Sequence, residues 1–335
     1  MKGLNRIPFN RTIEQFKSHG LSDTSSMILA ISLKYASENM KYIPKEATVK
    51  VNNSKMRLCP RQGGISRDLF IHKKREPLLT DCLIHSFILR EGDVVLDIGA
   101  NIGYYALVES QIVGKTGKVY AVEPVSSTFE LLEENLQVNN ANNVSSFNFA
   151  FGEKDGDSEI YVCNESNLCT MKKNTASSKI VSSQTVPVET VDSFLKDKRP
   201  PNLIRMDVEG YEYEIFKGMT ETIKGNSRIL MEFHYGRPFI EPADMTELFR
   251  LMEKNNFRVR FAIFEDKAHD NRIVRSLLTK AGYSLPFVFL NISINELQKL
   301  LETAYNEPPW PSSWPAITGR TPISPNVLLE KVSTD

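Results

Sequence analysis

Short apolar runs alternate with amphipathic segments through the middle of this 335-residue chain. The runs are 7–9 residues long, within the usual range for strands, and they lie at 94–100, 118–124, 144–152, 202–208 and 228–234. Between most of them, apolar residues recur every three or four positions, which is the helical period. Buried strands joined through helices form a parallel sheet that is covered on both faces. The pattern therefore predicts an α/β fold.

The two ends of the chain depart from this alternation. Residues 1–80 predict a helical extension on the substrate side, with an amphipathic helix at 23–40. Residues 81–305 would form the α/β domain, within which the polar stretch 163–184 predicts a loop or a small hairpin. Residues 306–335 are rich in proline and are expected to run extended along the surface. We therefore expect one domain with an extension at each end.

Composition excludes some functions and leaves others open. Lysine plus arginine equals aspartate plus glutamate at 41 each, so the chain has no net charge that would attract nucleic acid or anionic lipid. The four cysteines show no CxxC spacing, which favours reduced thiols over a zinc site. No apolar run approaches the ~20 residues of a membrane span, and the N-terminus has no apolar leader. We expect a cytoplasmic protein without a transmembrane segment. Oligomerisation stays open.

The ends of the expected strands carry acids, glycines and one histidine. In an open parallel sheet, ligands bind beyond the carboxyl ends of the strands. In chain order the residues at these ends are Asp97, Gly99, Asn101 and Gly103, then Glu123 and Pro124, then Ala150 and Phe151, then Asp207 and Glu209, and finally Glu232 and His234.

The first turn indicates a nucleotide without a pyrophosphate. Glu123 follows Gly103 by twenty residues, the usual interval for an acid that binds a ribose. Gly99 and Gly103 allow a sharp turn, but Asn101 departs from GxGxxG and no P-loop lysine follows. Asp97 would repel a phosphate and attract a cation. These features predict adenosine joined to a positive group, as in S-adenosylmethionine. A glycine turn in a nucleotide-free fold is the alternative.

Several blocks together resemble one enzyme family, the FkbM family of S-adenosylmethionine-dependent methyltransferases. The match runs from about residue 75 to 235, and its blocks are GDVVLDIGANIGYYALVES, VYAVEP, FAFGEKDGDSEIYV, VPVETVDSFL, LIRMDVEGYEYEIFKGM and ILMEFH. The resemblance implies a Rossmann-like class I methyltransferase with a seven-stranded, mostly parallel sheet, its last strand antiparallel and helices on both faces. It also implies O-methylation of a hydroxyl group on a sugar, glycan or other small molecule.

The resemblance assigns cofactor roles to individual positions. It matches Glu76 to a family position near the site, although an acid at a helix start is the simpler interpretation. Tyr104 either covers the cofactor or packs in the core. The other matched positions are Asp97, Gly99, Asn101 and Gly103 in the cofactor turn, Glu123 at the ribose, and Ala150 to Gly152 beside the adenine.

Methyl transfer to a hydroxyl needs alignment and a route for the proton. A neutral hydroxyl is a poor nucleophile, so a general base or a metal must assist. Residues two apart share a strand face, which groups Asp207 with Glu209 and Glu232 with His234. His234 is the first candidate base, because its ordinary pKa is nearest neutrality, and Glu209 is the second. Structural or cofactor-orienting roles are the alternatives.

A metal ion and two other functions remain as alternatives. A divalent cation on Asp207, Glu209 and Glu232 is chemically possible, but no motif supports it and no metal is predicted. Methylation of tRNA is the second enzyme hypothesis, against which stand the zero net charge and the absence of an Asn-Pro-Pro-Tyr motif. A non-catalytic binding protein is the third hypothesis, and the intact acidic strand ends argue against it.

Overall fold

The computed structural model describes most of the expected α/β domain and part of each extension. The described residues are 43–85, 88–172, 180–235, 240–264, 287–306 and 324–332. The predicted helix at 23–40 and residues 307–323 of the proline-rich tail lie outside them. None of the described helices is long and apolar enough to cross a bilayer.

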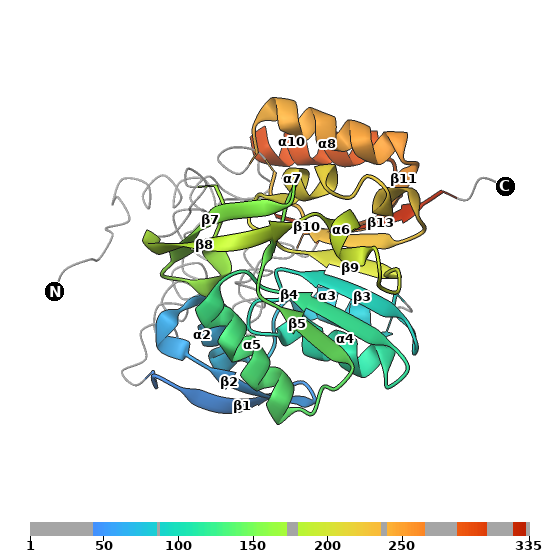
Figure 1. Ribbon diagram of the computed structural model, residues 1–335. Helices are drawn as coiled ribbons and strands as arrows, with labels where there is room; N and C mark the ends of the chain where they lie inside the picture. The colour runs from blue at the N-terminus through green and yellow to red at the C-terminus, as the bar shows by residue number, and fades with distance from the viewer. Residues whose placement is uncertain are drawn as a thin grey trace, which may run out of the picture.

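The centre of the molecule is an eight-stranded sheet with helices on both faces (Figure 1). From one edge to the other, its strands are β12 (Phe287–Ile292), β11 (Phe257–Phe264), β13 (Asn326–Lys331), β10 (Arg228–Glu232), β9 (Leu203–Met206), β3 (Val94–Ile98), β4 (Lys118–Val122) and β5 (Val144–Phe147). The last five are parallel to one another, and β13 runs antiparallel to both β10 and β11. The predicted α/β class and the reversed final strand are confirmed, but the described residues supply eight strands in place of seven.

The additional strand comes from the segment expected to be a surface tail. β13 inserts between β10 and β11, and Val327, Leu328 and Leu329 are buried there. The prediction of an extended surface tail for residues 306–335 is therefore wrong for 326–331. Three consecutive apolar residues are enough for a strand that is buried on both faces, and the surrounding prolines obscured them.

Two apolar cores lie on opposite faces of the sheet. Alternate β3 residues belong to different cores, with Leu96 in one and Val95 in the other, because successive strand side chains point to opposite faces. The first core is closed by α6 (Val191–Leu195), α7 (Glu212–Lys217), α8 (Pro242–Lys254) and α10 (Ile294–Asn306), and the second by α2 (Gly64–His72), α3 (Pro77–His85), α4 (Tyr104–Val113) and α5 (Ser126–Val138). Figure 1 shows α8 and α10 above the sheet and α2 and α5 below it.

The described part of the N-terminal extension is only partly helical. Residues 47–58 form a hairpin of β1 (Ala47–Val51) and β2 (Ser54–Leu58), whereas α2 and α3 follow as helices. The Lys55 N–H donates to the side chain of Asn139, the C-cap residue of α5, and Asn135 within this helix donates to the Arg57 carbonyl. The prediction of a helical extension is therefore wrong for this hairpin, which is fastened to α5.

A small second sheet stands beside the carboxyl ends of the large one. It consists of β6 (Ala150–Phe151), β8 (Ile180–Glu189) and β7 (Gly156–Cys163). The strands β7 and β8 flank the stretch 163–184, for which a loop or a small hairpin is predicted. The run 144–152, expected as one strand, divides between the two sheets at Asn148. The Asn148 side chain donates to the carbonyls of Glu123 and Pro124. The division forms one wall of the pocket described below.

The segment after DVEGYE anchors α7 to this small sheet. The Lys217 ammonium lies 2.5 Å from a Glu153 carboxylate oxygen. A Cβ on Gly218 would lie 2.0 Å from the Gly152 carbonyl oxygen, so only glycine permits this backbone approach. The Lys-Gly pair therefore has a structural role, which holds α7 against the end of β6.

Candidate active site

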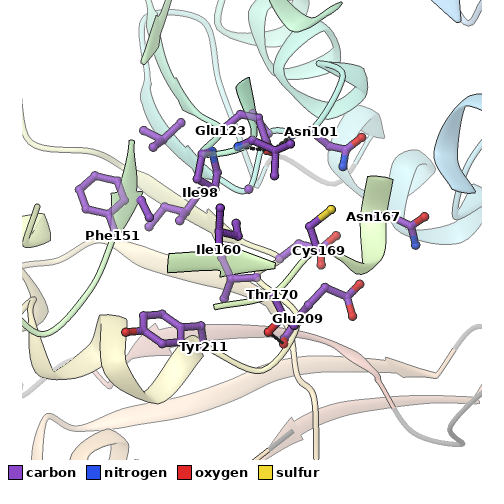
Figure 2. Close-up of a pocket in the computed structure, with 18 of the residues that line it drawn as sticks. Ile98, Asn101, Glu123, Phe151, Ile160, Asn167, Cys169, Thr170, Glu209 and Tyr211 are labelled. Carbon is purple, nitrogen blue, oxygen red and sulfur yellow. Dashed lines mark hydrogen bonds between the residues drawn. The ribbon is translucent and has the colours of Figure 1, made fainter. Parts of the chain in front are cut away.

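A pocket of about 800 Å³ opens at the carboxyl ends of β3, β4 and β9. Figure 2 shows Glu123 and Asn101 on one side of it and Glu209, Thr170 and Tyr211 on the other. Nine of the residues predicted from the sequence line it: Gly99, Asn101, Tyr104, Glu123, Pro124, Ala150, Phe151, Asp207 and Glu209. Five predicted residues are not among its lining residues: Glu76, Asp97, Gly103, Glu232 and His234.

Glu123 is fixed in the wall by backbone groups. One of its carboxylate oxygens accepts a hydrogen bond from the Asn101 N–H at 3.0 Å, and the other accepts from the Val125 N–H at 2.9 Å. Each oxygen has a second lone pair that can accept another hydrogen bond. This arrangement suits a pair of vicinal hydroxyls, such as those of a ribose.

The glycine turn has a geometry that leaves no donor for a phosphate. Gly99 has φ +80°, and a Cβ there would lie 2.0 Å from the Asp207 carbonyl oxygen. All five backbone N–H groups of residues 99–103 donate within the protein, to Val122 O (twice), Glu123 Oε2, Asn101 Oδ1 and Ala100 O. Phosphate-binding loops aim such groups at the ligand. The turn therefore supports the prediction of a nucleoside without a pyrophosphate.

The protonation of Glu123 should change near neutral pH. Burial raises the pKa of Glu123 to about 7, although the Val125 and Asn101 N–H groups oppose the shift. Since the acid is harder to ionise in the folded protein than in the unfolded chain, its contribution to stability declines from pH 4.5 to 7. A shift of this size corresponds to about 3 kcal/mol.

The variant Glu123→Gln should remove this decline. We expect the free energy of unfolding of wild type to fall by about 3 kcal/mol relative to the variant between pH 4.5 and 7, and to change no further above that. Denaturant titrations of both proteins at several pH values measure the difference. If the difference in free energy of unfolding between the two proteins did not change with pH, the pKa of Glu123 would be the same in the folded and unfolded states.

Asp97 lies beneath the turn instead of in the pocket. Its side chain is fully buried, and one oxygen accepts from Arg205 at 2.9 Å. Burial raises the pKa of Asp97 and Arg205 opposes this shift. The Arg205 guanidinium also stacks 3.9 Å above the centre of the Tyr105 ring. Asp97 is not among the lining residues of the pocket, and its ion pair with Arg205 connects β3 to β9 beneath it.

Glu109 on α4 is a buried acid near this pair. Neither carboxyl oxygen has a hydrogen-bond partner in the part of the chain that the structure describes. Burial, followed by repulsion from Asp97, raises the pKa of Glu109 well above its usual value. Burial therefore favours the neutral form of this carboxyl group, whose oxygens lack hydrogen-bond partners among the described residues.

Replacing Glu109 by leucine should stabilise the protein by about 1–3 kcal/mol, because the cost of burying an unsatisfied polar group is removed. Thermal and denaturant unfolding at pH 7.5 measure the change. Glu130→Leu on the exposed face of α5 is the control. Destabilisation by the Glu109 variant would show that its carboxyl group has a favourable interaction.

The loop between α2 and α3 supplies a second buried ion pair. An Arg75 nitrogen lies 3.2 Å from Glu76, and Glu76 accepts a 2.5 Å hydrogen bond from the Tyr105 hydroxyl. Tyr104 contacts this loop through the Arg75 carbonyl and also lines the pocket. Glu76 has φ +43°, which is rare for a glutamate. Glu76 thus supports the pocket from behind and is not one of its lining residues.

His234 lies between two carboxylates. Its Nδ1 is 2.6 Å from Glu212 and its Nε2 is 3.4 Å from Glu209. Burial alone would lower the pKa of His234, but the two carboxylates outweigh it and raise the pKa well above its ordinary value. The two carboxylates therefore favour the protonated form of the imidazole, which does not suit a general base. Glu209 lines the pocket and has φ +50°.

The sequence missed three charged residues of the site: Arg75, Arg205 and Glu212. Arg205 also reaches Asp207 at 3.4 Å, and Arg75 lies 4.0 Å from the same oxygen. The only available signal was the alternation along each strand, which places Arg205 on the same face as Asp207. Asp207, Glu232 and His234, which the sequence places at the ends of neighbouring strands, have ligand atoms within 4.8 Å of one another.

Comparison with known proteins decides the family. Residues 97–285, more than half of the chain, match the methyltransferase FkbM domain. The chain belongs to the FkbM family of S-adenosylmethionine-dependent methyltransferases. Residues 31–158 also match the protein-L-isoaspartate O-methyltransferase model. The resemblance in the strand-end motifs is thereby confirmed.

Individual relatives match only parts of this FkbM-family chain. Hexuronic acid methyltransferase AglP of Haloferax volcanii is 31% identical over 158 residues, which cover 47% of this chain and 62% of AglP. A protein-L-isoaspartate O-methyltransferase of Methanothrix thermoacetophila is 42% identical over 57 residues, which cover 17% of this chain and 27% of that enzyme. In the solved structure of M. jannaschii TYW2 with AdoMet, the matched region is 17% identical in sequence and has a TM-score of 0.39. It covers 67% of this chain and 80% of the TYW2 chain. The chain thus spans less than two thirds of these two sequence relatives.

Proposed function

We propose that this protein transfers the methyl group of S-adenosylmethionine to a hydroxyl group of a sugar, glycan or other small molecule. The observation that carries the proposal is the Glu123 carboxylate, held by two backbone N–H groups beside a turn without a donor for phosphate. That combination fits a nucleoside whose ribose hydroxyls donate to Glu123. S-adenosylmethionine is such a nucleoside, and the family membership supports its choice.

The acidic side of the pocket suits the reacting end of the cofactor. Asp207 and Glu209 line the pocket, and Figure 2 shows Glu209 across it from Glu123. Carboxylates favour a nearby positive charge, and the sulfonium and amino groups of S-adenosylmethionine are both positive. The pocket therefore offers complementary partners to the two ends of the cofactor.

Glu209 replaces His234 as the candidate base. Glu209 reaches the pocket, whereas His234 is not a lining residue, and its two carboxylate neighbours favour its protonated form. The Thr170 hydroxyl donates to the Glu209 carbonyl at 3.3 Å and helps to hold this segment. We assign Glu209 the acceptance of the hydroxyl proton.

The acceptor class rests on the relative AglP, whose name gives a hexuronic acid as its substrate. The test is to incubate the protein with methyl-labelled S-adenosylmethionine and a panel of hexuronic acids, neutral sugars and small alcohols. We expect label in a methyl ether of a sugar, which resists mild alkali. Label that is released by alkali would indicate a methyl ester and contradict transfer to a hydroxyl. No transfer to any member of the panel would contradict the acceptor class.

A further inference from the structure

Three potential metal ligands converge beside the pocket. Asp207 follows β9, whereas Glu232 ends the adjacent parallel strand β10 and His234 lies two residues further. One ligand atom from each residue lies within 4.8 Å of the other two. Ligands that share one ion at roughly 2.1 Å lie up to about 4.2 Å apart. Small side-chain rotations would therefore bring the three atoms into a single coordination sphere.

The orientation of His234 is a second and independent observation. Its Nδ1 is 2.6 Å from Glu212, and both side chains are buried. Metal-binding histidines usually donate one ring N–H to a carboxylate, which fixes the tautomer and directs the other nitrogen at the ion. Here Glu212 would accept a hydrogen bond from the Nδ1 proton, and a bound ion would displace the proton from Nε2, which then becomes the ligand. Glu212 is not itself one of the three converging residues.

The charges around the three ligands also favour a cation. Two guanidinium groups, those of Arg75 and Arg205, reach this region among the described residues. Each has a carboxylate partner of its own besides Asp207, namely Glu76 for Arg75 and Asp97 for Arg205. The carboxylates of Asp207, Glu209, Glu212 and Glu232 add further negative charge. The guanidinium charge is therefore smaller than the carboxylate charge gathered here.

We propose that Asp207, Glu232 and His234 bind one divalent first-row transition ion. An imidazole with two carboxylates suits Mn²⁺, Fe²⁺ or Zn²⁺ better than Mg²⁺ or Ca²⁺. The ligand set differs from the all-carboxylate set that the sequence allowed, because His234 takes the place of Glu209. Glu209 lines the pocket and is left to act on the acceptor.

The role of the ion rests on the proposed function. An ion at this position would lower the pKa of an acceptor hydroxyl in the pocket. The hydroxyl proton passes to Glu209, and the oxygen forms a bond to the methyl carbon. The carbon–sulfur bond breaks with its electron pair on sulfur. The products are a methyl ether, S-adenosylhomocysteine and one proton.

The experiment titrates Mn²⁺ into the full-length, chelator-stripped protein saturated with S-adenosylhomocysteine, followed by calorimetry and electron paramagnetic resonance. We expect one Mn²⁺ per chain. The variants His234→Ala and Glu232→Gln should weaken binding at least tenfold, and Glu212→Gln by about 10–100-fold. His85→Ala, an exposed histidine at the end of α3, is the matched control and should bind as wild type does.

The affinity for S-adenosylhomocysteine separates the possible failures. If wild type and the variants bind S-adenosylhomocysteine with the same affinity, the variants are folded and the cofactor site is intact. Absence of saturable binding of Mn²⁺ and Zn²⁺ to wild type would then overturn the metal site alone. An equal loss of binding in His85→Ala would indicate adsorption to surface charge and would also overturn it. Failure of wild type to bind S-adenosylhomocysteine would contradict the proposed function instead, and titration without it would still test the metal site.

Discussion

Replacing Arg205 by methionine is expected to lower the free energy of unfolding by about 3–5 kcal/mol. The substitution leaves the fully buried Asp97 carboxylate without the guanidinium that lies 2.9 Å away. Breaking a buried pair from one side costs this much because an uncompensated charge stays in the interior. Methionine keeps much of the side-chain volume, so the lost stability results mainly from the unpaired charge of Asp97 and less from a cavity. Denaturant titration at pH 7.5 measures the change.

The double variant Asp97→Asn/Arg205→Met distinguishes the effect of an unpaired charge on stability from the effect of altered packing. With both charges removed, we expect at least half of the lost stability to return, because the buried carboxylate is gone. Arg250→Met, at a side chain that is 67% exposed, is the control and should change stability by less than about 0.5 kcal/mol. A single Arg205 variant that is as stable as wild type would show that Asp97 is neutral or solvated.

Replacing Glu209 by glutamine should reduce the turnover number by about 100-fold to 10,000-fold, because this is the usual contribution of a general base. Glutamine retains the shape of the side chain but cannot take the hydroxyl proton. Glu209 is across the pocket from Glu123, so the KM for S-adenosylmethionine should change much less than kcat. Steady-state kinetics with an accepted sugar separate the two constants.

The control for this prediction is Glu130→Gln, which lies on the exposed face of α5. It should have wild-type kinetics. A Glu209 variant with wild-type turnover would remove Glu209 as the base. A large increase in the KM for S-adenosylmethionine with unchanged kcat would instead assign Glu209 to cofactor binding.

Much of the fold was predictable because its signals are local. The five parallel strands are short apolar runs, and the spacing between Gly103 and Glu123 is enough to indicate the ribose acid. β13 was missed because its burial depends on insertion between β10 and β11, which no neighbouring residue indicates. The single run 144–152 gave no sign that the chain leaves one sheet for another at Asn148.

The site was predictable where residues face a ligand and less so where they face one another. Arg205 and Asp97 are 108 positions apart, so their pairing appears only when β3 and β9 are adjacent. His234 was the first candidate base on its ordinary pKa. That expectation overlooked Glu212, a helical residue 22 positions earlier whose carboxylate holds the imidazole proton. The pKa of a buried group depends on such long-range neighbours.

Calorimetric titration of S-adenosylhomocysteine into the wild-type protein tests the central claim most directly. The account predicts saturable binding of one molecule per chain, and an affinity reduced at least tenfold in Glu123→Ala, which loses the charged acceptor for the ribose hydroxyls. Glu130→Ala should bind as wild type does. No binding at millimolar ligand, or equal affinity in wild type and Glu123→Ala, would contradict the claim that this pocket holds the methyl donor.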